Sequence, residues 1–436
     1  MNPDHTIDGA FPWPALEGPF KVGVMQFDLT DPKGVAAYAP VPQRGRRLNV
    51  WAWYPATPSA GSAPKRYMTP QETEVLPAAM NALFQRGPDA QRYLGETTTC
   101  SVAGATPDPA AGPCPVLVFT HGGVAHVLQN TALMEHLASH GYVVLSVAHP
   151  CESGGIVHAD GSTAVAPIEL TMDLAQALMH PDMLSYLVGD NATTRLQLAS
   201  RSVDRARSTW LPRLLNVWAE DLMFVVDALA SGDVPDPVKA LAGQCDTGRL
   251  GYFGMSYGGA VSLRACQLDP RAKAGVNMDG AMWTWDDFDS PCRTAFLALH
   301  SDPGLFVPIL GALGIDAATL NGGLDEHTPL FSDVNFEPIR AAGLRPDIHR
   351  YAIRGIGHHG FTDNLLLYRG EHRAVLGPAQ AQAPRLMRLQ NDLVQQFFDR
   401  YLRGQDGSFP PRPDAHPELV RRELSGFRLT AQGLAQ

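Results

Sequence analysis

Residues 249–260 read RLGYFGMSYGGA, a short apolar run that leads into Gly254-Met255-Ser256-Tyr257-Gly258 and then into small residues that suit a helix. A serine at a tight bend between a strand and a helix needs glycine on both sides, because side chains there would collide with the neighbouring strand and helix. The bend exposes the hydroxyl and places it at a helix N-terminus, where backbone N–H groups favour negative charge. The stretch therefore predicts a nucleophilic serine, Ser256, at a strand-to-helix turn.

The same pentapeptide has a purely structural interpretation. A chain with 41 glycines can contain it by chance, in a turn that packs tightly and does no chemistry. Partners for the serine at suitable places along the chain favour the functional interpretation.

Length and composition predict one large globular α/β domain. The 436 residues include 45% hydrophobic ones, which supply a sizeable core. The 34 basic and 44 acidic residues give a net charge of −10, which argues against nucleic acid or an anionic membrane as the main partner.

The ends and the cysteines give little information on the compartment. The first residues lack the basic and apolar regions of a secretory signal, and no apolar stretch is long enough to span a bilayer. We expect a soluble protein, cytoplasmic by default, and secreted or periplasmic if a signal peptide has been removed. Six cysteines without CxxC spacing predict neither a disulfide scaffold nor a zinc site; Cys100 and Cys114 are the expected pair in an oxidising compartment.

Apolar runs that alternate with helical stretches predict parallel βαβ units. Residues 22–29 and 48–54 are expected to form an antiparallel opening pair. Further strands are expected at 116–120, 142–147, 250–255, 274–278, 295–300 and 348–353, and helices at 71–84, 130–139, 170–178, 194–206, 217–229 and 384–402.

The expected fold class is α/β: an α/β-hydrolase fold with a mostly parallel central sheet, helices on both faces and a helical cap insertion. Residues 1–436 are expected to form a single domain. Its insertions are expected at 55–113, which would lie over the sheet, at 152–212, which would form the cap, and at 303–345.

A serine hydroxyl needs a base, an acid that orients the base, and N–H donors for the oxyanion. In this fold the chain order is Ser, then Asp or Glu, then His. His358, on a glycine-rich loop after the last strand, is the predicted base, and the adjacent His359 is its rival. Asp279 and Asp302 each end a strand and can each reach a histidine, so the residues alone leave the acid open.

The loop Thr120-His121-Gly122-Gly123-Val124 offers backbone with few side chains after the third strand. The N–H groups of Gly123 and Tyr257 are the expected oxyanion donors. His121 is expected to pack and to hold this loop by hydrogen bonds rather than to react.

With these residues the chain resembles the platelet-activating factor acetylhydrolases of plasma and of the type II intracellular class. The blocks that carry the likeness are Phe119–Gly123, Leu137–Val144, the elbow with Gly259-Ala260, Asp279-Gly280-Ala281-Met282, and Arg354-Gly355 before His358. The resemblance covers residues 20–55 and 115–400. It implies a triad of Ser256, Asp279 and His358, with Gly123 and Tyr257 as oxyanion donors.

Two positions differ from that family's pattern. Gly123 stands where the family has a bulky apolar residue, and Ala281 where it has a pocket tryptophan. Small changes beside an acyl pocket shift substrate preference. The elbow is also similar to that of the cutinase-like polyester hydrolases, whose acid follows the next strand, at the position of Asp302; those enzymes have almost no lid, unlike a chain with long insertions.

The sequence thus predicts a serine carboxylic-ester hydrolase, an acetylhydrolase-like carboxylesterase of lipid degradation, which forms an acyl-enzyme on Ser256 and acts on short-acyl esters. Alternatives are a cutinase-like polyester hydrolase, a peptidase or lactonase, and a non-catalytic binding protein with a hydrolase fold. No metal or organic cofactor is expected, the partner is a small-molecule or lipid-like ester, and the oligomeric state is left open. The expected lining of an acyl site is Met255, Tyr257, Met282, Trp283 and Trp285.

Overall fold

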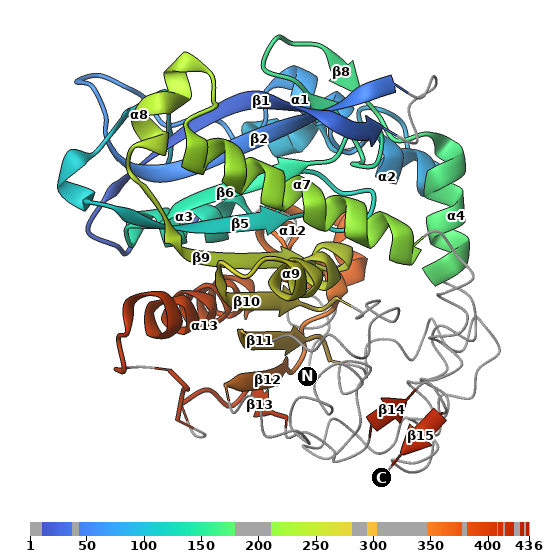
Figure 1. Ribbon diagram of the computed structural model, residues 1–436. Helices are drawn as coiled ribbons and strands as arrows, with labels where there is room; N and C mark the ends of the chain where they lie inside the picture. The colour runs from blue at the N-terminus through green and yellow to red at the C-terminus, as the bar shows by residue number, and fades with distance from the viewer. Residues whose placement is uncertain are drawn as a thin grey trace.

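A computed structural model describes residues 11–36, 43–178, 211–280, 294–302, 347–376, 382–407, 409–412, 415–422, 428–430 and 433–435. Its centre is a mixed sheet that extends through the whole molecule (Figure 1). Within these residues the strand order is β13-β12-β11-β10-β9-β5-β6-β2-β1-β3, and β4 pairs with β2.

The strands of this sheet are β1 (Lys21–Ala36), β2 (Gln43–Thr57), β3 (Val102–Ala103), β4 (Thr106–Pro107), β5 (Cys114–Thr120), β6 (Val143–Ala148), β9 (Cys245–Met255), β10 (Ala272–Met278), β11 (Ala295–His300), β12 (Ile348–Ile353) and β13 (Leu419–Arg421). The six strands from β6 to β12 in this order are mutually parallel. The opening pair β1 and β2 is antiparallel, as expected, and extends beyond the predicted bounds.

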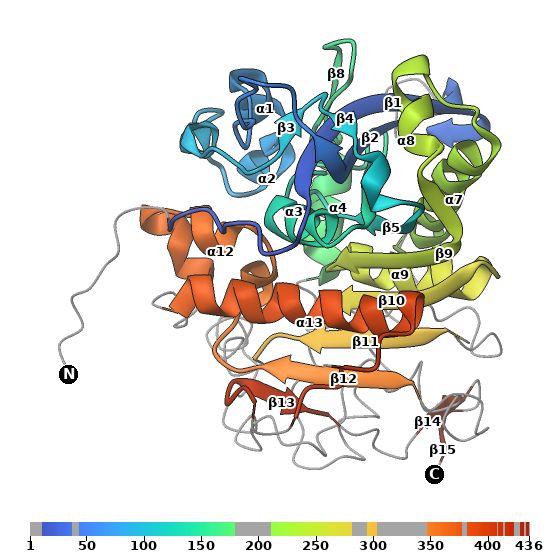
Figure 2. The same cartoon turned by 90° about the vertical axis from the view of Figure 1, so that its left-hand side faces the viewer.

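Helices cover both faces of the sheet. They are α1 (Pro70–Val75), α2 (Ala78–Leu83), α3 (Thr131–Ser139), α4 (Ile168–Leu178), α7 (Leu211–Ser231), α8 (Lys239–Ala242), α9 (Tyr257–Leu268), α12 (Asn364–Leu367) and α13 (Ala383–Arg403). In Figure 1 α7 and α9 lie in front of the sheet, and the turned view of Figure 2 shows α13 along the strands from β9 to β11.

The two helical layers make two cores, which the central strands separate. Along β5 the side chains of Val116 and Val118 belong to the core with α7 and α9, whereas Leu117 and Phe119 belong to the core with α3 and α13. Successive side chains of a strand point to opposite faces, so a continuously apolar strand is buried on both sides. The predicted α/β-hydrolase fold is confirmed by this arrangement.

The first insertion differs in detail from the expectation. The single helix expected at 71–84 is divided into α1 and α2, with Pro77 at the N-cap of α2. Proline cannot donate the N–H of a continuing helix, which explains the break. Part of the insertion also extends the sheet as β3 and β4 instead of lying over it.

The second insertion contributes α4 and a small hairpin of β7 (Ile156–Val157) and β8 (Thr163–Ala164), and near the C-terminus β14 (Arg428–Thr430) pairs with β15 (Gly433–Ala435). The helix expected at 194–206 and the third insertion lie outside the described residues.

Cys100 and Cys114 are both free thiols, so the disulfide expected under oxidising conditions is not present. Cys114 is buried at the start of β5, where its thiol donates to the Gly112 carbonyl, whereas the Cys100 thiol donates to the Pro14 carbonyl. No helix among the described residues is long and apolar enough to cross a membrane.

Candidate active site

Ser256 occupies the bend between β9 and α9. Its φ of 57° lies in a region that non-glycine residues rarely adopt. The backbone N–H of Ser256 donates to the Met278 carbonyl of β10 over 2.8 Å, and this bond helps to hold the strained conformation.

The glycines around the serine are required by close backbone approaches. A Cβ atom at Gly254 would lie 2.2 Å from the Gly258 carbonyl oxygen, and one at Gly258 would lie 2.1 Å from the Thr120 carbonyl oxygen. Both distances are far shorter than a van der Waals contact. A side chain at either position would therefore collide with the backbone, which is why the bend needs glycine on both sides of Ser256.

His358 lies between the serine and an aspartate. It begins a short 3₁₀ turn after β12, and its Nε2 is 2.9 Å from Ser256 Oγ. Its Nδ1 is 2.7 Å from Oδ2 of Asp279, the residue that follows β10. The structure thus brings Ser256, His358 and Asp279 into one hydrogen-bonded line at the carboxyl ends of the parallel strands.

Asp279 is held in place as an ionised carboxylate. Its other oxygen, Oδ1, accepts the Ser301 N–H over 2.7 Å, and its φ is 56°. Burial by itself raises the pKa of Asp279, but the hydrogen bond and charge of His358 and the Ser301 N–H lower it more, so the net pKa shift is downward. A negative carboxylate favours a positively charged imidazole beside it.

The two rival residues have other partners. Oδ2 of Asp302 accepts the Gly355 N–H over 3.0 Å, so this aspartate holds the start of the loop that carries His358. The ring of His359 lies 5.5 Å from that of His358, and burial, with the nearby His358, lowers the pKa of His359 to about 3.

The loop predicted to supply an oxyanion donor lies against the serine. A Cβ atom at Gly122 would be 3.2 Å from Ser256 Cβ, and Val124 has a φ of 51°. Tyr257 is the first residue of α9, where backbone N–H groups point out of the N-terminal end of the helix.

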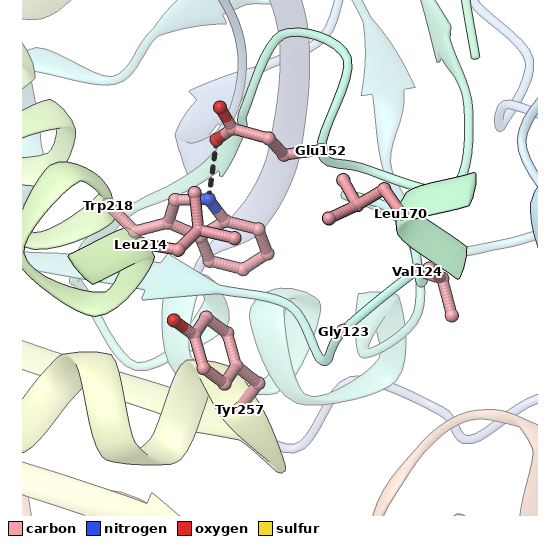
Figure 3. Close-up of a pocket in the computed structure, with 7 residues that line it drawn as sticks. All are labelled: Gly123, Val124, Glu152, Leu170, Leu214, Trp218 and Tyr257. Carbon is pink, nitrogen blue, oxygen red and sulfur yellow. Dashed lines mark hydrogen bonds between the residues drawn. The ribbon is translucent and has the colours of Figure 1, made fainter. Parts of the chain in front are cut away.

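Gly123 and Tyr257 also line a small cavity of about 10 Å³, which is room for about one water molecule. Figure 3 shows this cavity, whose other lining residues are Val124, Glu152, Leu170, Leu214 and Trp218. The Trp218 indole N–H donates to Glu152 over 2.7 Å, and the Trp218 and Tyr257 rings pack edge to face with centroids 5.1 Å apart.

The residues that line the cavity differ from those expected from the sequence. Tyr257 lines it, Met255 is buried at the end of β9, and Met282, Trp283 and Trp285 lie outside the described residues. The lining residues that were not predicted, Glu152, Leu170, Leu214 and Trp218, lie far from Ser256 in the sequence. Only the one-turn spacing of Leu214 and Trp218 gave a local signal of a shared helix face.

Metal ligands do not gather here. Within the part of the chain that the structure describes, no group of three or more His, Cys, Asp or Glu side chains could hold a metal ion.

Known proteins resemble this chain both in sequence and in fold. Two curated relatives match 39% of the chain each: a probable 1-alkyl-2-acetylglycerophosphocholine esterase of Arthroderma benhamiae, 24% identical, and a platelet-activating factor acetylhydrolase of Cavia porcellus, 25% identical. The matched segments span only 32% and 35% of these relatives' own length.

A solved ferulic acid esterase from Streptomyces cinnamoneus has the same fold, with a TM-score of 0.66 at 23% identity, over 95% of this chain and 100% of that one. The profile of the family "Platelet-activating factor acetylhydrolase, isoform II" matches residues 6–302, more than half of the chain. The chain therefore belongs to the platelet-activating factor acetylhydrolase isoform II family.

Proposed function

We propose that this protein is a serine carboxylic-ester hydrolase that forms an acyl-enzyme on Ser256 and prefers short-acyl esters. The observation that carries the proposal is the hydrogen-bonded line from Ser256 through His358 to Asp279. Family membership supports the same reaction class.

The chemistry follows from the donors and acceptors in this line. His358 Nε2 takes the proton of Ser256 Oγ as the oxygen attacks the ester carbonyl carbon, and the carbonyl electron pair moves onto its oxygen. The N–H groups of Gly123 and Tyr257 stabilise that oxyanion. When the carbon–oxygen bond to the leaving group breaks, His358 returns the proton to the alcohol.

Deacylation repeats the sequence with water. His358 accepts a proton from the water molecule that attacks the acyl carbonyl, and then gives it to Ser256 Oγ as the carboxylic acid leaves. Asp279 keeps the Nδ1 hydrogen of His358 directed at itself and stabilises the imidazolium in both steps.

The short-acyl preference rests on the cavity beside the two oxyanion donors. Leu214 and Trp218 of α7 line this cavity, and its volume of about 10 Å³ holds one group of about the size of a water molecule, so the methyl group of an acetyl ester is the acyl tail that we propose for it. Because the Arthroderma benhamiae relative is named as a probable 1-alkyl-2-acetylglycerophosphocholine esterase, a 1-alkyl-2-acetylglycerophosphocholine is the first natural substrate to assay.

Hydrolysis of p-nitrophenyl esters from acetate to palmitate, by the wild type and by Ser256→Ala, tests the proposal. We expect activity greatest on the short chains and a loss of about four orders of magnitude or more in kcat in the variant. Equal activity of Ser256→Ala would contradict the acyl-enzyme, and activity greatest on palmitate would contradict the chain-length preference.

Three further measurements separate the alternatives. A non-catalytic binding protein would leave a fluorophosphonate reagent unreacted, whereas we expect covalent labelling of Ser256. A peptidase would cleave p-nitroanilides in preference to esters. A cutinase-like enzyme would release soluble products from a suspended polyester and would depend on Asp302.

A further inference from the structure

His121, the residue that opens the oxyanion loop, makes a hydrogen bond with each of its ring nitrogens. Its Nδ1 is 2.7 Å from the Gly122 carbonyl oxygen, and its Nε2 is 2.6 Å from Ser153 Oγ. The side chain is completely buried, with its ring edge-on to Trp218 at 5.1 Å. These contacts fix the plane of the imidazole.

The Gly122 carbonyl determines which nitrogen of His121 carries the hydrogen. A carbonyl oxygen can only accept, so Nδ1 carries the hydrogen and donates to it. Nε2 then accepts from the Ser153 hydroxyl, whose oxygen in turn accepts the backbone N–H of His149 over 2.8 Å. Burial, with the nearby His149, lowers the pKa of His121 to about 3, so the ring is neutral and has only one N–H.

The Gly122 carbonyl and the Gly123 N–H belong to the same peptide unit. A trans peptide is planar, and its C=O and N–H point in opposite directions. A donor that holds the Gly122 oxygen therefore also sets the direction of the Gly123 N–H. Two glycines in succession have little conformational preference of their own, so the direction must come from such external contacts.

Other contacts hold the same loop less closely. The Ala125 N–H reaches the Gly122 oxygen over 3.2 Å, and the Gly122 N–H donates to Gln129 Oε1 over 3.2 Å. The His121 bond is the shortest of the three, and it originates from a side chain that is itself buried and fixed.

We propose that Ser153 and His121 are positioning residues of the oxyanion hole: the Ser153 hydroxyl donates to Nε2 and so stabilises the His121 tautomer whose Nδ1–H holds the Gly122 carbonyl, and this bond directs the Gly123 N–H at the developing oxyanion. This inference rests on the proposed function, because it assigns these residues to the transition state of ester hydrolysis. Neither residue touches the reacting atoms.

The test compares kcat and KM on p-nitrophenyl acetate for paired variants. His121→Ala removes the donor, whereas His121→Asn places an amide N–H near the position of Nδ1. Ser153→Ala removes the hydroxyl, whereas Ser153→Thr retains it. We expect both alanine variants to lose about 10- to 100-fold in kcat, below the 10²–10³ of a deleted oxyanion donor, with KM changed less than threefold. The asparagine and threonine variants should recover most of the loss.

Ser146→Ala is the matched control. Ser146 is another buried serine. Its hydroxyl donates over 2.8 Å to the carbonyl of Val127, which lies a few residues after the oxyanion loop. We expect it to lose stability comparable to that of Ser153→Ala and to keep kcat. Equal losses of kcat in Ser146→Ala and Ser153→Ala would overturn the proposal, because they would indicate loosened packing alone.

A transition-state analogue gives a second measurement that packing alone would not alter. A trifluoromethyl ketone with a short chain places an oxyanion in the hole, so its inhibition constant should rise in parallel with the loss of kcat/KM across the variants. An inhibition constant unchanged in His121→Ala would overturn the inference. If the wild type hydrolyses esters and Ser256→Ala does not, while all His121 and Ser153 variants remain fully active, the inference fails and the proposed function stands.

Discussion

Two residues of the candidate triad occupy strained backbone positions at the ends of adjacent strands. Ser256 and Asp279 have φ values of 57° and 56°. Such conformations cost on the order of 1–3 kcal/mol each and persist where surrounding bonds over-determine them. The Asp279 N–H donates to the Leu299 carbonyl over 2.8 Å, and the Asn277 side chain bonds both the N–H and the carbonyl of Gly280. The strain turns the hydroxyl and the carboxylate toward the same histidine.

The two aspartates should therefore respond differently to the same change. Asp279→Asn keeps the size of the side chain but favours the wrong tautomer of His358, so we expect kcat on p-nitrophenyl acetate to fall by about 10⁴. Asp302→Asn retains an oxygen for the Gly355 N–H, and its kcat should fall less than tenfold. A larger loss in Asp302→Asn, with unchanged thermal unfolding, would contradict the choice of acid.

At the scale of elements, α7 connects the acyl cavity to a buried ionic network. Leu214 and Trp218 line the cavity, and Asp221, on the same face, binds Arg46 of β2 through both oxygens. Arg46 also forms an ion pair with Glu152, which accepts the Trp218 N–H. Breaking a buried ion pair leaves an uncompensated charge, so the network fixes α7, and with it the depth of the cavity.

Replacement of Trp218 should change the acyl-chain preference. Trp218→Ala opens space behind the cavity, and we expect the ratio of kcat/KM for p-nitrophenyl hexanoate to that for acetate to rise about tenfold or more. The variant should also lose about 3–5 kcal/mol of stability, because a buried indole is removed. Trp218→Phe, which retains a ring at the cavity, is the control and should keep the acetate preference. An unchanged ratio in a folded Trp218→Ala would show that acyl chains bind elsewhere.

At the scale of the whole molecule, burial makes the fold sensitive to acid. Burial is the largest cause of a lowered pKa for His121, His126, His136, His300 and His359, each at about 3, and for His349 at about 4. In the unfolded chain a histidine titrates near 6.5, so between pH 6.5 and about 4 the unfolded state binds more protons. The folded state must lose stability as the pH falls through this window.

Buried carboxyl groups oppose this trend, because burial raises the pKa of Glu135, Glu152, Glu220, Asp221, Asp363 and Asp392. Burial raises the pKa of Asp221 to about 6, so between about pH 4 and 6 the folded state binds the extra proton at this site and gains stability as the pH falls. The effect of the histidines begins near pH 6.5, above the pKa of about 6 at which Asp221 takes up its proton, so the histidines dominate in the upper part of the window. We expect the urea concentration at the unfolding midpoint to fall from about pH 7.5 to about 5.5. His136→Gln, which lies on α3 away from the triad, should reduce this pH dependence. A midpoint that stays constant or rises over this range would contradict the prediction.

Much of the fold was predictable from local sequence. The runs at β5, β6 and β11 are largely apolar, as strands covered on both faces must be, and the structure has strands there, and at β10 and β12, within about two residues of the predicted bounds. The division of residues 71–84 into two helices was missed although Pro77 was visible, because the apolar spacing continues across the proline.

The sequence by itself determined the strand-to-helix bend at Ser256 and the order of its possible partners, since the need for glycine and for an apolar strand is local. Only the tertiary structure decided which partners meet. Asp279 and Asp302 each follow a strand. Asp279 follows β10, which lies beside β9, and its carboxylate binds His358. The carboxylate of Asp302 accepts the Gly355 N–H instead. The lining of the cavity and the hydrogen bonds of His121 likewise depend on residues far apart in the chain. Leu214 and Trp218 reach the cavity because α7 packs against the oxyanion loop, and Ser153 reaches His121 because the segment after β6 packs there.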